Sequence, residues 1–274
     1  MNLIQNLTIQ SKLKKSFLCV GLDPDVELMP TGYPKNPDGI FDFNKDIIEA
    51  TKHFAIAYKL NTAFYELWGS KGWEVLEKTV ALLPESSFKI ADAKRGDIQH
   101  SAAKYAETFF EKLNFDALTV SPFLGLDSLE PFLKYDQKIT IVLGLTSNFG
   151  ATDFQKTLVQ HQLLEKPTFL FEKIIKTIAK KYSYEKLMFV IGATNQNLIR
   201  EIRDWIPKHF FLVPGVGTQQ GNLEHVIIQG KTPQGGLIIN VGRDIIYHSQ
   251  SRDKVYEEIN QRAAQYHQEM MKFF

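Results

Sequence analysis

The sequence predicts an α/β fold in which eight parallel strands alternate with helices and close into a barrel. Two observations lead to this prediction. Short runs rich in β-branched and aromatic residues recur along the whole chain, and each is followed by a longer segment with helical spacing, as in repeated βα units. Most of these runs are almost continuously apolar, which is typical of parallel strands that helices cover on the outside.

The expected strands are spread over the whole chain. They are Phe17–Asp23, Phe54–Leu60, Phe88–Lys94, Ala117–Pro122, Ile139–Thr146, Leu187–Thr194, Phe210–Val216 and Leu237–Gly242. Eight βα units in about 250 residues are the content of a TIM (β/α)8 barrel, whose catalytic groups lie at the C-terminal ends of the strands. A doubly wound open sheet is the structural alternative, because the count of eight is an interpretation of apolar runs.

Helical spacing is found between the expected strands and after the last one. The helical segments are Phe43–Thr51, Lys71–Leu83, Ile98–Leu113, Pro167–Lys181, Gln196–Trp205 and Asp253–Met271. Two connections, Ser147–Lys166 and Gly217–Gly235, are long enough that we expect them to be lids or interface loops. No break in composition marks a second domain, so we expect residues 1–274 to form one domain.

Composition narrows the classes of partner. The 32 basic and 31 acidic residues give a formal net charge of +1, which provides no general field for nucleic acid or an anionic membrane. An anionic ligand must therefore be held by a local site. Cys19, the single cysteine, lies in an apolar run and is predicted to be a buried thiol. Because no apolar stretch reaches the roughly 18 residues that span a bilayer and no signal-peptide core is found, we expect a cytoplasmic protein.

Ionisable residues stand at the C-terminal ends of four expected strands. Asp23 and Lys59 stand at the ends of the first two, Asp92 and Lys94 lie on the third, and Arg243 follows the eighth. An apolar strand interior has no use for a charge, so these residues are candidates for chemistry. Ordinary salt bridges at the rim of the barrel are the alternative for each residue taken singly.

The third expected strand is the most informative. Side chains two residues apart on a strand share a face, so Asp92 and Lys94 are both expected to point into the mouth of the barrel. Asp97 lies in the following turn and is free to face another site, including one on a neighbouring subunit. Ser101, in the first turn of the next helix, can reach the same ligand, although an exposed helix cap fits its spacing equally well. The bare D-x-K-x-x-D pattern is weak, and its place on the third strand gives it value.

Two glycine-containing segments follow the seventh and eighth strands. Residues 214–221 read Pro-Gly-Val-Gly-Thr-Gln-Gln-Gly, and residues 240–244 read Asn-Val-Gly-Arg-Asp. Barrels commonly hold a phosphate at this place, where glycines let backbone N–H groups approach the oxygens and Arg243 adds charge-assisted hydrogen bonds. A plain glycine-rich turn is the alternative. The G-x-G-x-x-x-G spacing near the end of the chain does not fit a dinucleotide site, and the sequence has no H-E-x-x-H, G-x-S-x-G or G-x-x-x-x-G-K-[ST] motif.

Five segments in this order together resemble the orotidine 5′-phosphate decarboxylase family. They are Gly21-Leu-Asp-Pro24, Tyr58-Lys-Leu-Asn61, Ala91-Asp-Ala-Lys-Arg-Gly-Asp-Ile98, Pro214-Gly-Val-Gly217 and Val241-Gly-Arg243. The third segment and the chain length are similar to the larger bacterial branch of the family. The resemblance implies a homodimeric TIM barrel with active sites at the subunit interface. It also implies decarboxylation of orotidine 5′-phosphate (OMP) to uridine 5′-phosphate (UMP), the last step of de novo pyrimidine nucleotide synthesis, without metal or cofactor.

The resemblance also implies a role for individual residues. Lys94 would donate the proton, Asp92 would lie against the substrate carboxylate, and Lys59 would link them to the ribose. Asp97 would enter from the partner subunit. Further substrate contacts would come from Asp23 at a ribose hydroxyl, Ile98 and Ser101 of the partner subunit, Ser147 at the pyrimidine amide edge, Pro214 in its glycine-containing motif, and Gln219, Gly242 and Arg243 at the phosphate.

The chemistry of the reaction agrees with these roles. Loss of CO2 leaves a carbanion at C6 that has no conjugated electron sink, and a lysine ammonium both stabilises this charge and supplies a proton. Two alternatives remain open. One is a metal-dependent relative acting on 3-keto-gulonate or hexulose phosphates, which places a magnesium-binding glutamate on the second strand where this chain has Lys59. The other is a non-catalytic nucleotide-binding barrel, which would not need the costly pairing of Lys94 with carboxylates.

Overall fold

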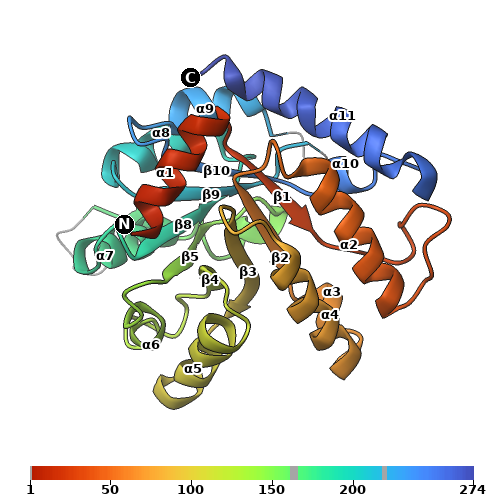
Figure 1. Ribbon diagram of the computed structural model, residues 1–274. Helices are drawn as coiled ribbons and strands as arrows, with labels where there is room; N and C mark the ends of the chain where they lie inside the picture. Colours follow the sequence, from red (N-terminus) through yellow and green to blue (C-terminus); the bar gives the residue numbers. More distant parts are fainter. Residues whose placement is uncertain (1, 161–165, 218–220) are drawn as a thin grey trace.

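The computed structural model describes residues 2–160, 166–217 and 221–274, and within them eight parallel strands close into a barrel (Figure 1). Around the barrel the strands follow the order β1-β10-β9-β8-β5-β4-β3-β2. The TIM-barrel prediction is confirmed, and the open-sheet alternative is wrong. The barrel strands are β1 (Leu18–Leu22), β2 (Ala57–Asn61), β3 (Phe88–Arg95), β4 (Ala117–Val120), β5 (Ile139–Leu145), β8 (Leu187–Ile191), β9 (Phe210–Pro214) and β10 (Leu237–Val241).

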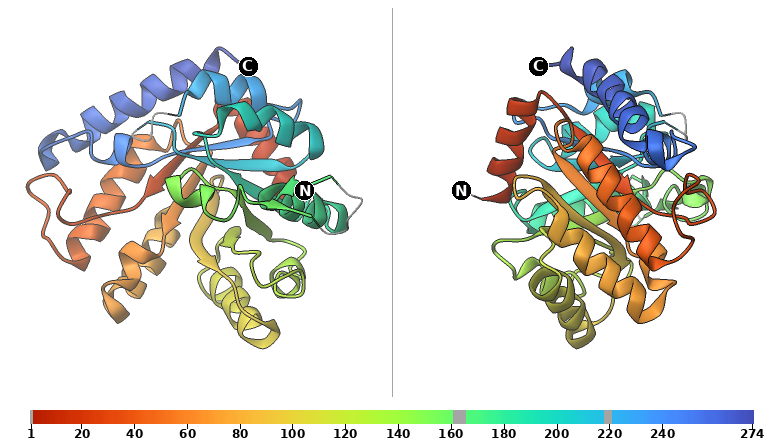
Figure 2. Two further views of the ribbon diagram at one scale, coloured as in Figure 1. Left: turned by 180° about the vertical axis from the view of Figure 1, so that it is seen from behind. Right: turned by 45° about the vertical axis from the view of Figure 1, so that its right-hand side comes forward.

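Helices follow the strands and surround the barrel, as both views of Figure 2 show. The longer ones are α2 (Pro37–Thr51), α4 (Gly69–Leu82), α5 (Gln99–Ala106) with its π-helical continuation η1 (Glu107–Lys112), α7 (Leu170–Lys181), α8 (Gln196–Trp205), α9 (Leu223–Gly230) and α11 (Arg252–Met271). Short elements are α3 (Ala63–Glu66), α6 (Glu130–Leu133), α10 (Arg243–Ile246), the 3₁₀ turn η2 (Phe149–Thr152) and the antiparallel pair β6 (Leu158–Val159) and β7 (Thr168–Phe169).

The barrel interior changes character along its axis. Because successive side chains of a strand alternate between its faces, every second residue points inward. The inward residues toward the N-terminal ends form one apolar cluster, which includes Cys19, Ala57, Phe88, Ile90, Ala117, Ile139, Ile141, Met188, Val190, Phe210, Leu212 and Ile238. Continuing the same alternation toward the C-terminal ends reaches Lys59, Asp92 and Asn240. The polar end of the barrel therefore rests on an apolar floor.

The first helix, α1 (Leu3–Lys14), closes the N-terminal end of the barrel (Figure 2, right). Its residues Ile4 and Leu7 belong to the apolar cluster of the barrel interior, and Lys14 Nζ donates to the carbonyls of Lys52 and Ala55, both at 2.7 Å. The sequence analysis did not predict this helix. Its apolar residues are isolated among polar ones, and only the barrel end supplies a surface that buries them.

The structure corrects one of the two expected long connections. Residues Leu223–Gly230, inside the expected loop Gly217–Gly235, form α9, so this segment is not a lid as a whole. Asn222 caps the helix by accepting from the N–H of His225, and Leu223, Val226 and Ile227 are buried with helical spacing. The cap and the spacing are signals of a helix that the sequence contains, but the glycines on either side of the segment favour a loop.

Other boundaries differ by a few residues. The expected loop Ser147–Lys166 contains η2 and β6, and β6 pairs with β7 beyond it. The second strand begins at Ala57, not at Phe54, because the N–H groups of residues 54 and 55 complete the end of α2 by bonding to the carbonyl of Thr51. Within the described part of the chain, no helix combines the length and the apolar character needed to cross a membrane.

Candidate active site

Four charged side chains meet at the C-terminal ends of β1, β2 and β3. Lys59 is buried, and its Nζ lies 2.9 Å from Asp92 Oδ2 and 3.3 Å from Asp23 Oδ1. Lys94 Nζ lies 2.7 Å from the other oxygen of Asp92, Oδ1. Asp92 therefore bridges two ammonium groups. We call Asp23, Lys59, Asp92 and Lys94 the charged array.

A buried hydroxyl on β4 holds the third-strand part of the array. Thr119 Oγ1 donates to Asp92 Oδ1 at 3.0 Å and accepts from the backbone N–H of Lys94 at 2.9 Å. Lys94 has φ +48°, in the left-handed region, where the register of β3 against β4 shifts between Ala91 and Arg95. A non-glycine residue in this region is strained, and such strain persists only where the surroundings hold it. Asp92 and Lys94 do meet as predicted, although simple strand alternation ends at this irregularity.

The array fixes the charge of its buried members. Burial by itself would lower the pKa of Lys59, but the carboxylates of Asp23 and Asp92 outweigh it and raise that pKa above its ordinary value. Burial would likewise raise the pKa of Asp92, but Lys59 and Lys94 hold it well below its ordinary value. At neutral pH, Lys59 is therefore a cation and Asp92 an anion. Beneath them, burial raises the pKa of Cys19, which is the neutral buried thiol that the sequence predicted.

A cavity of about 170 Å³ opens onto the array at the mouth of the barrel. Its wall on the β5 side includes Ser147. A Cβ added at Gly192 would lie 2.5 Å from the backbone nitrogen of Ser147, so a glycine is required there for this segment to come so close. The cavity is lined by Asp23, Lys59, Asn61, Asp92, Ser147, Pro214, Gly215, Val216, Asn240, Gly242 and Arg243.

The opposite wall of the cavity consists of the turns after β9 and β10. Gly215 and Gly217 have φ values of +97° and +90°, which only glycine adopts readily. The N–H of Gly221 donates to the carbonyl of Gly215 at 3.0 Å and draws the turn together. Arg243 opens α10 directly after Gly242, and although exposed it lines the cavity. The two glycine turns thus lie side by side, with a guanidinium at their edge.

Comparison with known proteins places the chain in a family. The profile of the orotidine 5′-phosphate decarboxylase / HUMPS family matches residues 16–259. The chain is 48% identical over 250 residues to the orotidine 5′-phosphate decarboxylase of Christiangramia forsetii, covering 90% of each chain, and 49% identical over 246 residues to that of Bacteroides fragilis, covering 89% of this chain and 88% of the other. This chain belongs to the orotidine 5′-phosphate decarboxylase family. The structure of OMP decarboxylase from Leishmania donovani matches with a TM-score of 0.80 at 33% identity, covering 96% of this chain and 99% of that one.

Most residues assigned from the resemblance to the decarboxylase family meet at this place. Seven of them line the cavity, and Lys94 joins them through Asp92. Among the described residues, Asp97 Oδ1 accepts from the N–H of Ile98 at 2.8 Å and does not contact the charged array. Ile98 and Ser101 are exposed on the outside of the barrel mouth. Gln219 lies outside the described residues.

Three polar residues of the site were given no role by the sequence analysis, although Asn61 and Asn240 lie in segments that it quoted. Thr119 holds Asp92 and Lys94, and Asn61 and Asn240 line the cavity. The signal was strand alternation: Asn61 stands two residues after Lys59, Asn240 two residues before Gly242, and Thr119 two residues after the inward Ala117. Each is a single polar residue that points into the barrel near the C-terminal end of an apolar strand. This pattern alone would have identified each of them as a candidate site residue.

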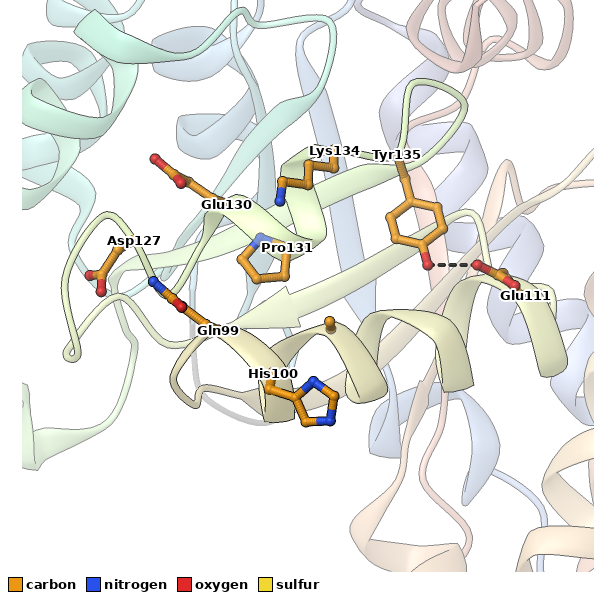
Figure 3. Close-up of a pocket in the computed structure, with 9 residues that line it drawn as sticks. Gln99, His100, Glu111, Asp127, Glu130, Pro131, Lys134 and Tyr135 are labelled. Carbon is orange, nitrogen blue, oxygen red and sulfur yellow. Dashed lines mark hydrogen bonds between the residues drawn. The ribbon is translucent and has the colours of Figure 1, made fainter.

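Size alone does not locate the active site of this decarboxylase-family chain. A larger cavity, of about 710 Å³, lies on the outside between α5 and α6 (Figure 3). Its wall includes Gln99, His100 and Lys134, and Tyr135 donates a hydrogen bond of 2.6 Å to Glu111 at its edge. No residue of the charged array lines it. Chemistry therefore points to the smaller cavity.

Proposed function

We propose that this chain decarboxylates OMP to UMP and that Lys94 supplies the proton. The family and the names of the curated relatives support the reaction. The observation that carries the residue roles is the bridging of Lys59 and Lys94 by the largely buried carboxylate of Asp92 at the floor of a cavity. In the reaction the bond between C6 and the carboxylate breaks, its electron pair remains on C6, and a proton from Lys94 Nζ replaces the departing CO2.

The array is suited to a reaction in which negative charge moves onto carbon. Lys94 is half-exposed, so its ammonium can turn from Asp92 toward a substrate above it. Asp92, ionised and held by Lys59 and Thr119, would face the substrate carboxylate at close range. In the complex with substrate, the carboxylate of Asp92 and that of the substrate would repel each other, and this repulsion would be relieved as CO2 leaves. The ammonium of Lys94 meanwhile stabilises the developing carbanion.

The remaining cavity residues would hold the nucleotide. The glycine turns after β9 and β10, with Arg243, are suited to a phosphate because their backbone N–H groups and the guanidinium are complementary to its oxygens. Asp23 would accept a hydrogen bond from a ribose hydroxyl, and Ser147 would contact the base. Binding energy from these remote groups is needed, because this decarboxylation lies near the top of the range of enzymatic barrier reduction, about 20 kcal/mol.

We further propose that the chain acts as a homodimer with shared active sites. Asp97, Ile98 and Ser101 follow β3 but do not enter the cavity of their own chain. Ile98 is 64% exposed, and Phe123, which follows the neighbouring β4, is 86% exposed. Large apolar side chains exposed together mark an interaction surface. A second copy packed there would cover them and bring its Asp97 to the array.

We also propose that residues 1–274 act as a single domain. The barrel strands run from Leu18 to Val241, and the family match extends from residue 16 to 259. Helices α1 and α11 pack on this barrel from either end of the chain. A cytoplasmic location stays a prediction from the sequence.

A turnover assay tests the function. The purified chain should consume OMP, followed by absorbance, at the same rate with and without a chelator. Lys59 favours this outcome, because its ammonium already pairs with both carboxylates at which a divalent ion would bind and would repel that ion. Sensitivity to the chelator would instead support the metal-dependent sugar-phosphate relative. A complete lack of OMP turnover combined with UMP binding would support the non-catalytic barrel.

Mixing two inactive variants tests the shared site. Lys94→Ala and Asp97→Ala each disable one contribution, and a mixed dimer contains one site with both defects and one intact site. After dissociation and reassociation, an equal mixture should regain about a quarter of the wild-type activity, because about half of the dimers are mixed. A mixture with no activity beyond that of the separate variants would place Asp97 in its own chain's site.

A further inference from the structure

A second polar cluster lies behind the two glycine turns, outside the cavity. Asp244, the residue after Arg243, accepts hydrogen bonds at a single oxygen, Oδ2. The donors are Arg262 Nε at 3.1 Å, Arg262 Nη2 at 2.5 Å and the hydroxyl of Tyr266. Arg262 and Tyr266 lie one turn apart on α11. We call Asp244, Arg262 and Tyr266 the Asp244 cluster.

Burial, a cation–π contact and a further hydrogen bond hold the Asp244 cluster in place. Tyr266 is buried, and the guanidinium of Arg262 lies 5.0 Å from the centre of its ring. Arg262 Nη1 also donates to Gln265 at 2.7 Å. Burial, together with the hydrogen bond to Asp244, raises the pKa of Tyr266, so its hydroxyl remains a donor at neutral pH.

Both glycine turns rest on this cluster. Asp244 belongs to the turn after β10. In the turn after β9, a Cβ added at Gly217 would lie 2.9 Å from the hydroxyl oxygen of Tyr266 and 3.1 Å from Asp244 Cβ. Only a residue without a side chain lets the two turns meet there. None of the three cluster residues lines the cavity.

We propose that Tyr266 and Arg262, acting through Asp244, position the two glycine turns and thereby set the affinity for the phosphate end of the nucleotide. This inference rests on the proposed function, because it takes the glycine turns to be the phosphate site. The cluster residues are positioning residues, since they do not touch the ligand. The proposed ribose and base contacts, Asp23 after β1 and Ser147 after β5, line the cavity and take no part in the hydrogen bonds that hold the cluster together.

Comparing the binding of UMP with that of uridine, which lacks the phosphate, distinguishes an effect on phosphate binding from a general effect on nucleotide binding. Dissociation constants for UMP and for uridine are measured with the full-length wild type, Tyr266→Phe, Asp244→Asn and the double variant. Loss of the Tyr266 hydrogen bond to a carboxylate should weaken UMP binding about tenfold. Uridine binding should stay within twofold of the wild type. The double variant should bind UMP no more weakly than Asp244→Asn alone, because Tyr266 acts through that carboxylate.

A matched control is available on the same helix. Asn260 Nδ2 donates to the carbonyl of Ala50 at 2.8 Å and ties α11 to α2, away from the turns. Asn260→Ala should lower the melting temperature about as much as Tyr266→Phe but leave both dissociation constants unchanged. In steady-state turnover, Tyr266→Phe should raise KM for OMP by a larger factor than it lowers kcat.

The outcomes distinguish this inference from the proposed function. If the wild type consumes OMP but Tyr266→Phe binds UMP normally, or loses UMP and uridine affinity equally, the inference is overturned and the proposed function stands. If the wild type neither consumes OMP nor binds UMP, both are overturned.

Discussion

At the N-terminal end of the barrel, α1 adds Ile4 and Leu7 to a closed apolar interior, whereas at the C-terminal end the same strands carry Asp23, Lys59 and Asp92. Burial of apolar surface at the first end stabilises the fold. At the second end, the array must offset the cost of burying charges, and such buried pairs add little net stability. The molecule therefore separates stability from chemistry along one axis.

Substitutions at each end of the barrel can test this separation of stability from chemistry. If it holds, substitutions at the C-terminal end change turnover without unfolding the chain, and substitutions at the N-terminal end do the reverse. Four variants with matched controls test it.

Lys94→Ala should have the largest effect, lowering kcat/KM for OMP by at least about 10³-fold, because it removes the proposed proton donor and the charge proposed to lie beside C6. The melting temperature should change by only a few degrees, since Lys94 is half-exposed and alanine adopts its positive φ no worse than lysine. Lys89→Ala, on the same strand but not at the cavity, is the control and should keep normal turnover. Turnover of Lys94→Ala within tenfold of the wild type would remove Lys94 from the reaction.

Leu7→Ala should lower the free energy of unfolding by about 2–5 kcal/mol, because Leu7 is 2% exposed and its loss leaves a cavity beneath the barrel. The kcat of the folded protein should be unchanged. Leu13→Ala, on the same helix at 73% exposure, should alter neither quantity measurably. Denaturant unfolding measures the stability of each variant, and steady-state turnover measures its kcat. A loss of kcat in folded Leu7→Ala would show that the two ends are coupled.

Thr119→Val keeps the shape of the side chain but deprives Asp92 and Lys94 of a shared partner. We expect kcat/KM to fall about 10- to 100-fold, the effect of losing one hydrogen bond to a charged group. Thr119→Ser should restore most of the activity. Thr140→Val is the control on β5, because the buried hydroxyl of Thr140 has no partner among the described residues. Equal losses in Thr119→Val and Thr140→Val would reduce Thr119 to a packing role.

His209→Gln should have the smallest effect, and only in acid. Burial, and then the charge of Arg203, lower the pKa of His209 to about 4, so the folded chain keeps this side chain neutral. The unfolded chain takes up a proton below about pH 6.5, and stability is therefore lost as the pH falls from there toward 4. His209→Gln should lose about 1–3 kcal/mol less than the wild type between pH 7 and 4.

The exposed His53 provides the control for the acid experiment. His53→Gln should follow the wild type in urea unfolding at each pH. His209 precedes β9 at the N-terminal end of the barrel, so this result would also place the acid-sensitive group at the stabilising end. Parallel pH curves for wild type and His209→Gln would contradict the assignment.

The sequence predicted much of this architecture because its signals are local. Continuous apolar runs separated by helical spacing predicted the barrel. Charges at the ends of those runs predicted that Asp23, Lys59, Asp92 and Arg243 lie at its mouth. Helix α9 was missed although its cap and its spacing are local too. Helix α1 was missed for a different reason, since its burial depends on a surface formed by strands far along the chain.

The sequence by itself determined the eight barrel strands and the family, since both depend on residue type and spacing. Only the tertiary structure decided which of these residues touch. Thr119 reaches Asp92 and Lys94 because β4 lies beside β3 and the register shifts between them, and Asp244 supports two turns because α11 returns from the end of the chain to pack behind them. Contacts between distant segments depend on how the strands close and the helices pack, which no local pattern records.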